Sequence, residues 1–353
     1  MFCQQFIKYI FNFCTVCGTI MIVYFLGVFM VALNPIFNDN MIMQANKPVR
    51  FFGNGVGLVS ILFNGIKKNF SAEGSWLIEF DSVDYGGPYS IEIMLDDKIV
   101  TLENVYFGDV YLLGGQSNMQ FKLWESSEKK ENYKENKNVR LFTVDRMEDG
   151  ERFKSSDGWV ELTFDTAPDF SAIGYYVAQE LARDDRKIGL IACYQGASVI
   201  QSWMSKEYAL VPEFKIENRF ADHVWFPVWN DDGVLYENML TKIMPYSMAS
   251  VLWYQGESNA SVDEANIYLE LLRALITNWR KDFKDLELEF IIIQLADHLD
   301  RAGYAWSKIQ EQQLLAQNEI PCVKTVVCRD VCDNIDIHPK EKDILSKRIA
   351  ELL

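Results

Sequence analysis

The chain has 353 residues, of which 49% are hydrophobic, so it is long enough to bury the core of one large domain with a smaller one or an appendage. Its formal net charge of −16 argues against nucleic-acid binding, because no surplus of basic side chains remains to neutralise phosphates, and it disfavours an anionic membrane surface. The spacing of the seven cysteines does not indicate a disulfide framework. Cys328 and Cys332 lack a second Cys or His pair with the spacing of metal ligands. We therefore predict buried thiols and no metal site.

The N-terminal 33 residues carry a long apolar run. Residues 6–33 are almost wholly apolar, and residues 20–33 contain no charged side chain. Because about 20 apolar residues span a bilayer, we predict a signal peptide or a transmembrane anchor over residues 1–33. Either kind of segment predicts export, with the rest of the chain extracellular or anchored outside the cytoplasm. The membrane is a partner only where the segment is not cleaved.

Residues 34–105 have the pattern of a small β-sandwich domain. Short alternating apolar runs are separated by turn signals such as Gly53-Asn-Gly and Gly86-Gly-Pro. Five strands are expected, at residues 49–52, 58–63, 76–80, 89–95 and 98–102. This stretch contains no histidine, so we expect no catalytic group in it.

From residue 106 to the end, apolar runs alternate with helical patterns, which predicts a parallel sheet flanked by helices. Strands are expected at residues 110–113, 188–193, 250–254, 290–295 and 324–328. Helices are expected from a Ser171 cap through residue 183, from an Asp263 cap through residue 282, over residues 304–317, and from residue 340 to the end. Residues 125–138 and 205–232 are expected to be loop insertions of the kind that build substrate walls.

Four unusual loops are expected at the carboxyl edge of this sheet. Three follow predicted strands, and the fourth lies near the end: Gly115-Gln-Ser-Asn, Gln195-Gly-Ala-Ser, Gln255-Gly-Glu-Ser-Asn and Asp333-Asn-Ile-Asp-Ile-His-Pro. Open α/β sheets bind ligands outside the carboxyl ends of their strands, so we expect these loops to converge on one site.

The side chains of these loops supply what serine hydrolysis needs. Ser117 is the candidate nucleophile, and His338 is the candidate base that takes its proton. Asp336 or Asp333 is the carboxylate expected to orient the imidazole. The tetrahedral intermediate also needs donors for its oxyanion. The candidates are the backbone N–H of Ser117, a backbone N–H at Gly196 or Ala197, and the side-chain amide of Gln255.

Two other histidines compete with His338 for the role of base. His298 follows a predicted strand and also reaches the sheet edge, whereas His223 lies in an aromatic loop. Pro339 favours His338, because proline restricts the preceding backbone and marks a helix start. Glu257 lacks the partner carboxylate that a glycosidase needs, so we interpret it as an acceptor that orients a neighbour. Four tryptophans are candidates for stacking on sugar or for packing: Trp124, Trp203, Trp225 and Trp229.

Several segments together resemble the sialate O-acetylesterase family of SGNH hydrolases. The three that carry the resemblance are Gly108-Asp-Val-Tyr-Leu-Leu-Gly-Gly-Gln-Ser-Asn-Met, Trp253-Tyr-Gln-Gly-Glu-Ser-Asn-Ala and Asp336-Ile-His-Pro. Ile36-Phe-Asn-Asp-Asn-Met-Ile-Met-Gln and Gly233-Val-Leu-Tyr-Glu-Asn-Met-Leu extend it over most of the chain from residue 34. It implies a flavodoxin-like, three-layer α/β/α SGNH-hydrolase domain over residues 106–353, preceded by the β-sandwich.

The resemblance implies a carboxylic ester hydrolase that removes acetyl groups from O-acetylated sialic acids or similar sugars through an acetyl-enzyme, without a metal or organic cofactor. Ser117 is then the nucleophile, His338 the base and Asp336 its carboxylate partner. Many SGNH relatives place that carboxylate three residues before the histidine, where this chain has Ile335, so Asp333 and a Ser–His dyad stay open. The positions expected around the substrate are Gln116, Asn118, Gly196, Ala197, Gln255 and Glu257.

Two alternatives stay open. An acetylxylan-type polysaccharide esterase would use the same chemistry on another sugar. A sialate carboxylate would instead favour a basic side chain at the site, for which the candidates are Lys206, Lys215 and Arg219. A catalytically silent carbohydrate-binding surface protein is the third possibility, and the presence together of Ser117, Gln255 and His338 speaks against it.

Overall fold

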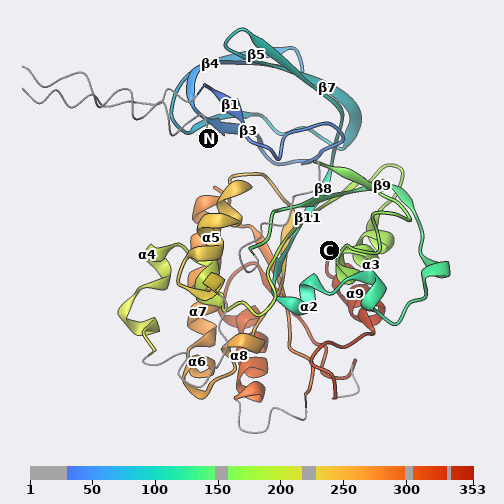
Figure 1. Cartoon of the computed structure of the whole chain (residues 1–353), viewed down its shortest axis with the longest axis vertical. Coiled ribbons are helices and arrows are strands. Elements are labelled where there is room, and N and C mark those ends of the chain that lie inside the picture. Colours follow the sequence, from blue (N-terminus) through green and yellow to red (C-terminus); the bar gives the residue numbers. More distant parts are fainter. Residues whose placement is uncertain (1–29, 148–157, 217–227, 299–304, 332–334) are drawn as a thin grey trace, which may run out of the picture.

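The computed structural model describes residues 30–147, 158–216, 228–298, 305–331 and 335–353. The protein is an α/β protein in which a β-rich N-terminal part lies at one end of a large mixed sheet with helices on both faces (Figure 1). Some predicted positions lie outside the described residues: residues 1–29 of the predicted signal or anchor, Arg219, His223, Trp225, Cys332 and Asp333.

The N-terminal part contains two groups of strands. One is an antiparallel sheet of three strands: β1 (Ala32–Leu33), β3 (Val49–Asn54) and β6 (Trp76–Phe80). The other attaches to the large sheet: β2 (Ile42–Gln44), β4 (Val56–Phe63), β5 (Ile66–Glu73), β7 (Gly86–Leu95) and β8 (Lys98–Gly115). The rings of Phe51 and Phe80, from the first group, lie 6.3 and 5.6 Å from the ring of Phe63 in β4. Aromatic packing therefore joins the two groups.

The last residues of the N-terminal apolar run belong to this folded part. Val31 is buried, and Ala32 and Leu33 pair with Asn54 and Gly53 of β3. The predicted segment 1–33 thus overlaps strand β1 at its end. Among the residues that the structure describes, no helix is long and apolar enough to cross a membrane.

Strand β8 connects the two parts. Its first half pairs with β7, whereas Asp109 to Gly115 pair in parallel with β11. The strands predicted at residues 98–102 and 110–113 are therefore two ends of one strand, and the predicted boundary between residues 105 and 106 falls inside it. The first half mixes exposed and buried residues, but every residue from Phe107 onward is buried. Continuous burial is expected where a parallel strand is covered on both faces.

Within the described residues, the main path of the eleven-stranded large sheet has the order β10-β9-β11-β8-β12-β13-β14, and β2, β4, β5 and β7 lie off this path. The strands not yet given are β9 (Asn136–Thr143), β10 (Val160–Leu162), β11 (Ile188–Tyr194), β12 (Ser250–Tyr254), β13 (Glu289–Ile293) and β14 (Val323–Val326). All neighbours on this path are parallel except β10 and β9. The five strands from β11 to β14 have the flavodoxin-like order 2-1-3-4-5, and β9 and β10 extend the sheet beyond β11.

Helices cover both faces of this sheet (Figure 1). One face carries α3 (Ala172–Leu181) and α9 (Lys342–Ala350). The other carries α5 (Val234–Asn238), α6 (Val262–Asn266), α7 (Tyr268–Asp282) and α8 (Trp306–Glu319). The short helices α2 (Ser117–Gln120) and α4 (Lys206–Ala209) lie in loops. Single 3-10 turns lie at Leu123–Glu125, Lys130–Asn132, Ile200–Trp203, Pro212–Phe214, Val228–Asn230, Leu240–Lys242 and Glu257–Asn259.

Two further sequence-based expectations differ from the structure. Strand β9 begins inside the predicted loop 125–138, and the apolar residues from Val139 onward are its buried core. The helix predicted from an Asp263 cap is two helices, α6 and α7, which are separated at Ile267. Its cap is Ser261, whose hydroxyl accepts a hydrogen bond from Glu264 N at 3.3 Å, as Ser commonly does at this position.

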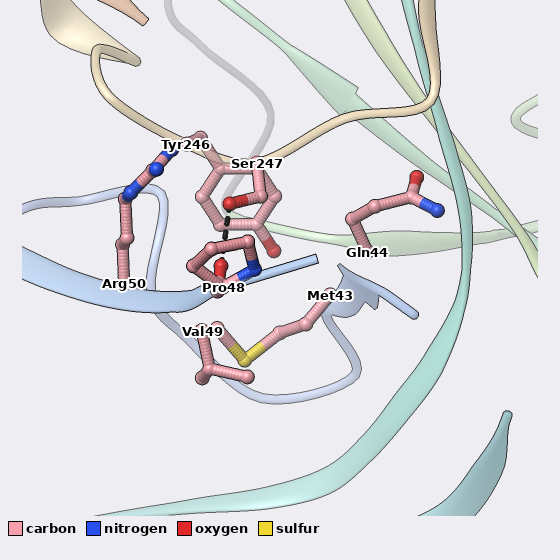
Figure 2. Close-up of a pocket in the computed structure, with 7 residues that line it drawn as sticks. All are labelled: Met43, Gln44, Pro48, Val49, Arg50, Tyr246 and Ser247. Carbon is pink, nitrogen blue, oxygen red and sulfur yellow. Dashed lines mark hydrogen bonds between the residues drawn. The ribbon is translucent and has the colours of Figure 1, made fainter. Parts of the chain in front are cut away.

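A hollow marks the junction of the two parts at the amino edge of the large sheet (Figure 2). Its lining residues are Met43, Gln44, Pro48, Val49, Arg50, Tyr246 and Ser247. Ser247 Oγ donates to Pro48 O at 2.6 Å, and the Tyr246 hydroxyl donates to Ile42 O at 2.8 Å. These bonds attach the N-terminal strands to the segment before β12. The predicted loops lie at the opposite, carboxyl edge.

Candidate active site

Three of the predicted loops leave the sheet at the same level. Gly115 at the end of β8 pairs with Tyr194 of β11 on one side and Tyr254 of β12 on the other. Gly115 has a φ of +120°, and a Cβ atom there would lie 2.1 Å from Tyr254 O. Only glycine fits so close to the neighbouring strand at this φ. The sequence Gly115-Gln-Ser therefore turns the chain directly above the three central strand ends.

The structure brings Ser117 and His338 together. Ser117 is the first residue of α2, and its Oγ lies 2.8 Å from His338 Nε2. His338 comes from the loop that precedes α9, and its ring stacks on Phe121 at a centroid distance of 6.0 Å. A nucleophile and a base need this hydrogen-bond distance for proton transfer.

The surroundings of His338 favour its neutral form. Burial lowers the pKa of His338 below its ordinary value, and the positive charge of Lys342 lowers it further. The carboxylates of Asp336 and Glu125 act in the opposite direction. A neutral imidazole at Nε2 accepts the proton of Ser117, so the pKa shift suits the role of a base.

Asp336 lies beside His338 but makes its hydrogen bond to the backbone. Asp336 Oδ1 accepts from His338 N at 2.8 Å, whereas the same oxygen is 3.9 Å from His338 Nδ1, which is too long for a hydrogen bond. The Asp336 side chain is 50% exposed. Asp333, the alternative carboxylate, lies outside the described residues. Of the other histidines, His298 packs against Trp306 at a ring distance of 5.8 Å and is not the partner of Ser117.

Backbone donors lie close to the serine. The Gly196 backbone is near enough that a Cβ built on it would be 3.8 Å from Ser117 Cβ. Gly196 N donates to Gln120 Oε1 at 2.8 Å, and Ala197 follows with a φ of +53°. The sequence-based list of site residues lacks Gln120. The spacing could have identified Gln120, because it lies three residues after Ser117 and a helical turn places such residues on the same face.

The Gln255 side chain is held by hydrogen bonds inside the protein. It is fully buried, and its Nε2 donates to Asn259 Oδ1 at 2.7 Å and to Ser198 O at 3.0 Å. Tyr268 donates to its Oε1 at 2.7 Å. The Gln255 amide thus joins the second and third loops, and these bonds use both of its amide hydrogens.

The remaining predicted side chains also join loops to one another. With its amide oriented to donate, Gln116 reaches Glu257 Oε2 at 3.1 Å. Asn118 Nδ2 donates to Glu257 Oε1 at 2.7 Å and to Ile337 O at 2.9 Å. Glu257 therefore accepts hydrogen bonds from both side chains. These bonds hold the first, third and fourth loops in one cluster.

The predicted tryptophans differ in exposure. Trp203 is fully buried and donates to Ser198 Oγ at 2.9 Å, and Trp229 donates to Gly196 O at 3.2 Å, so both support the second loop. Trp124 is 57% exposed in the turn after α2. Within the described ranges, no group of three or more His, Cys, Asp or Glu residues is placed to hold a metal ion. Cys193 and Cys328 are buried cysteines that form no disulfide within the described residues.

A serine–histidine pair at the carboxyl edge of an open parallel sheet is an arrangement that ester hydrolases use. The model of the family described as carbohydrate esterase, sialic acid-specific acetylesterase, matches residues 107–352. The chain belongs to this family.

Individual relatives agree with this assignment. The chain is 27% identical to rat sialate O-acetylesterase over 80% of its own length and 64% of the rat protein, and 24% identical to the human enzyme over 78% and 59%. It thus spans less than two thirds of the length of these relatives. Among solved structures, it is similar to XAC1771, a carbohydrate acetylesterase from Xanthomonas citri, with a TM-score of 0.78 and 28% identity over 91% of this chain and 74% of that one.

Proposed function

We propose that this protein is a serine-dependent carbohydrate O-acetylesterase. The observation that carries the proposal is the 2.8 Å contact between Ser117 Oγ and His338 Nε2, at the carboxyl edge of the sheet, in a chain of the carbohydrate esterase family. The acetylated sugar is the substrate class that the names of the family and of its relatives suggest.

In the proposed reaction, His338 Nε2 takes the proton of Ser117 as its oxygen attacks the acetyl carbonyl. The tetrahedral intermediate collapses when the bond to the sugar oxygen breaks, and the imidazolium returns the proton to that oxygen. The sugar leaves as an alcohol, and Ser117 carries the acetyl group. A water molecule then gives a proton to His338 and attacks the acetyl-enzyme, which releases acetate and restores the serine.

The oxyanion is proposed to accept from the backbone N–H groups of Ser117 and Gly196. In the free protein the amide oxygen of Gln120 accepts from Gly196 N, so the substrate oxygen must replace it. Gln120→Glu should lower kcat/KM by about 10²-fold or more, because a carboxylate would hold this donor and repel the oxyanion. Gln120→Met, which is similar in size and lacks the acceptor, should stay within about tenfold of the native rate. Equal rates of ester hydrolysis in the two variants would contradict this oxyanion site.

The carboxylate partner of His338 is proposed to be Asp336. Its Oδ1 already lies 3.9 Å from His338 Nδ1, and catalytic hydrogen bonds often tighten when substrate binds. Asp336→Asn should lower kcat at least about tenfold more than Asp333→Asn, because the imidazolium loses the charge that stabilises it. Steady-state kinetics of both variants decide the matter. A larger loss at Asp333 would reassign the role to that residue, and small losses at both would indicate a dyad.

The preferred substrate is proposed to be an O-acetylated sialic acid, with acetylated xylan as the alternative. Among the basic candidates, Lys206 lies 3.2 Å from Glu237, so part of its charge is already paired. The test is acetate release from O-acetylated sialic acid and from acetylated xylan by the full chain. A higher kcat/KM on the sialic acid is expected. The reverse order would make the protein a polysaccharide esterase, and binding of either sugar without acetate release would favour a silent binding protein.

Export and the domain organisation are also proposed. The apolar composition of residues 1–33 supports a signal peptide or an anchor that places the rest of the chain outside the cytoplasm. We further propose a β-sandwich over residues 34–105 that supports the hydrolase domain from its amino edge. Fractionation of cells that express the full chain tests the first point, since recovery in the cytoplasm alone would contradict it.

A further inference from the structure

Lys342 is a buried lysine beside the candidate site. It is the first residue of α9, four residues after His338, and only 1% of it is exposed. Its Nζ donates to Asn118 Oδ1 at 2.6 Å and lies over the rings of Phe121 and Tyr254, at 5.0 and 5.3 Å from their centroids. Lysine is rarely this buried, and burial costs free energy unless specific partners hold the charge.

The bond to Lys342 fixes the orientation of the Asn118 amide. The Nδ2 group of Asn118 gives its hydrogens to Glu257 Oε1 and to Ile337 O, so its oxygen must face the ammonium. The flipped amide would set donor against donor at Lys342 and acceptor against two acceptors on the other side. Ile337 directly precedes His338. The Asn118 side chain therefore connects the serine turn to the histidine loop.

We propose that Lys342 is a positioning residue for the reaction. Its ammonium holds Asn118 in the orientation that keeps Ser117 and His338 within hydrogen-bond distance, and its charge acts on the His338 imidazole. This inference rests on the proposed function of the Ser117–His338 pair and adds a residue to it.

The charge of Lys342 acts on His338 together with three other groups. Asp336 and Glu125 stabilise the imidazolium, whereas Lys342 and His298 destabilise it. Burial lowers the pKa of Lys342 to about 8, against opposing charges that include Glu257. Below that pH the lysine is charged, so its replacement by a neutral side chain should raise the pKa of His338.

The experiment compares Lys342→Met and Lys342→Gln with the exposed control Lys340→Met, each in the full chain. Met removes both the donor and the charge, whereas Gln keeps a donor and removes only the charge. With p-nitrophenyl acetate, Lys342→Met should lower kcat by about 10- to 100-fold with KM within about threefold, because Asn118 loses the bond that orients it beside the reacting pair. Lys342→Gln should lose less activity than Lys342→Met. If Lys342→Met does not fold, Lys342→Gln should still fold. Lys340→Met should match the native chain.

A second readout does not depend on activity. NMR titration of the three histidine rings gives the pKa of His338 directly, and both Lys342 variants should raise it. An unchanged His338 pKa in a folded Lys342 variant overturns the inference. If activity and melting temperature then fall together, the lysine has only a structural role. If the native chain hydrolyses no ester, the proposed function fails, whereas the titration still tests the effect of Lys342.

Discussion

Ser117→Ala should lower kcat for ester hydrolysis by about 10⁴-fold or more. Ser117 Oγ is the atom that lies 2.8 Å from His338 Nε2, and alanine leaves no oxygen to form the acetyl-enzyme. The fold should not change, because Ser117 lies at the sheet edge and is not fully buried. Steady-state hydrolysis of p-nitrophenyl acetate by the full chain measures the loss.

A matched control separates loss of the nucleophile from general effects of serine replacement. Ser90 lies exposed on β7, so Ser90→Ala should keep the native rate. Rapid quenching and mass spectrometry of the tryptic peptide that contains Ser117 should detect the acetyl group in the native chain alone. A Ser117→Ala variant as active as the Ser90 control would exclude the serine mechanism, whatever the substrate.

The convergence of the four loops is predictable because it depends on the sheet alone. Parallel strands end at one edge, and the registers place Gly115, Tyr194 and Tyr254 at the same level. Short apolar runs that end in Gly or polar residues identify such strand ends in a sequence. The shared edge brings both His338 and His298 near the site, and the structure pairs His338 with Ser117.

Side-chain direction within the loops is less predictable. Gln255 has the residue type of an oxyanion donor, but its backbone places the amide inside the protein, where Ser198 and Asn259 accept its hydrogens. Asp336 has a carboxylate two residues before the histidine, but in the free protein its oxygen caps the backbone N–H of His338. Both outcomes depend on rotamers and local turns, which residue type and spacing do not determine.

Lys342 and strand β9 show two further limits of sequence reasoning. A lysine at the start of a helix is usually exposed, and only the fold around α9 buries this one against Asn118. Strand β9 begins in a polar segment, and its apolar residues, from Val139 on, are recognisable as a strand only when β10 and β11 flank it. Tertiary contacts decide such cases, and a local pattern does not contain them.

His338→Asn should lower kcat by about 10⁴-fold or more, because His338 Nε2 is the atom placed 2.8 Å from Ser117 Oγ to take its proton. Asparagine keeps polarity and approximate size but does not titrate.

The pH profile of the native chain gives the second half of this prediction. Burial and Lys342 lower the pKa of His338, so the neutral base persists at pH values below its ordinary pKa of about 6.5. The midpoint of the acidic fall in the native kcat/KM should therefore lie below pH 6.5.

The sign of this effect follows from the protonation state that reacts. Acid converts His338 to the imidazolium, which accepts no proton from Ser117, so activity is lost as the pH falls through the lowered pKa. In His338→Asn the residual rate should lack this acidic limb, because the titrating group is gone. His298→Asn is the matched control, since His298 packs against Trp306, and it should retain the limb. An acidic limb that survives in His338→Asn and disappears in His298→Asn would transfer the role of base to His298.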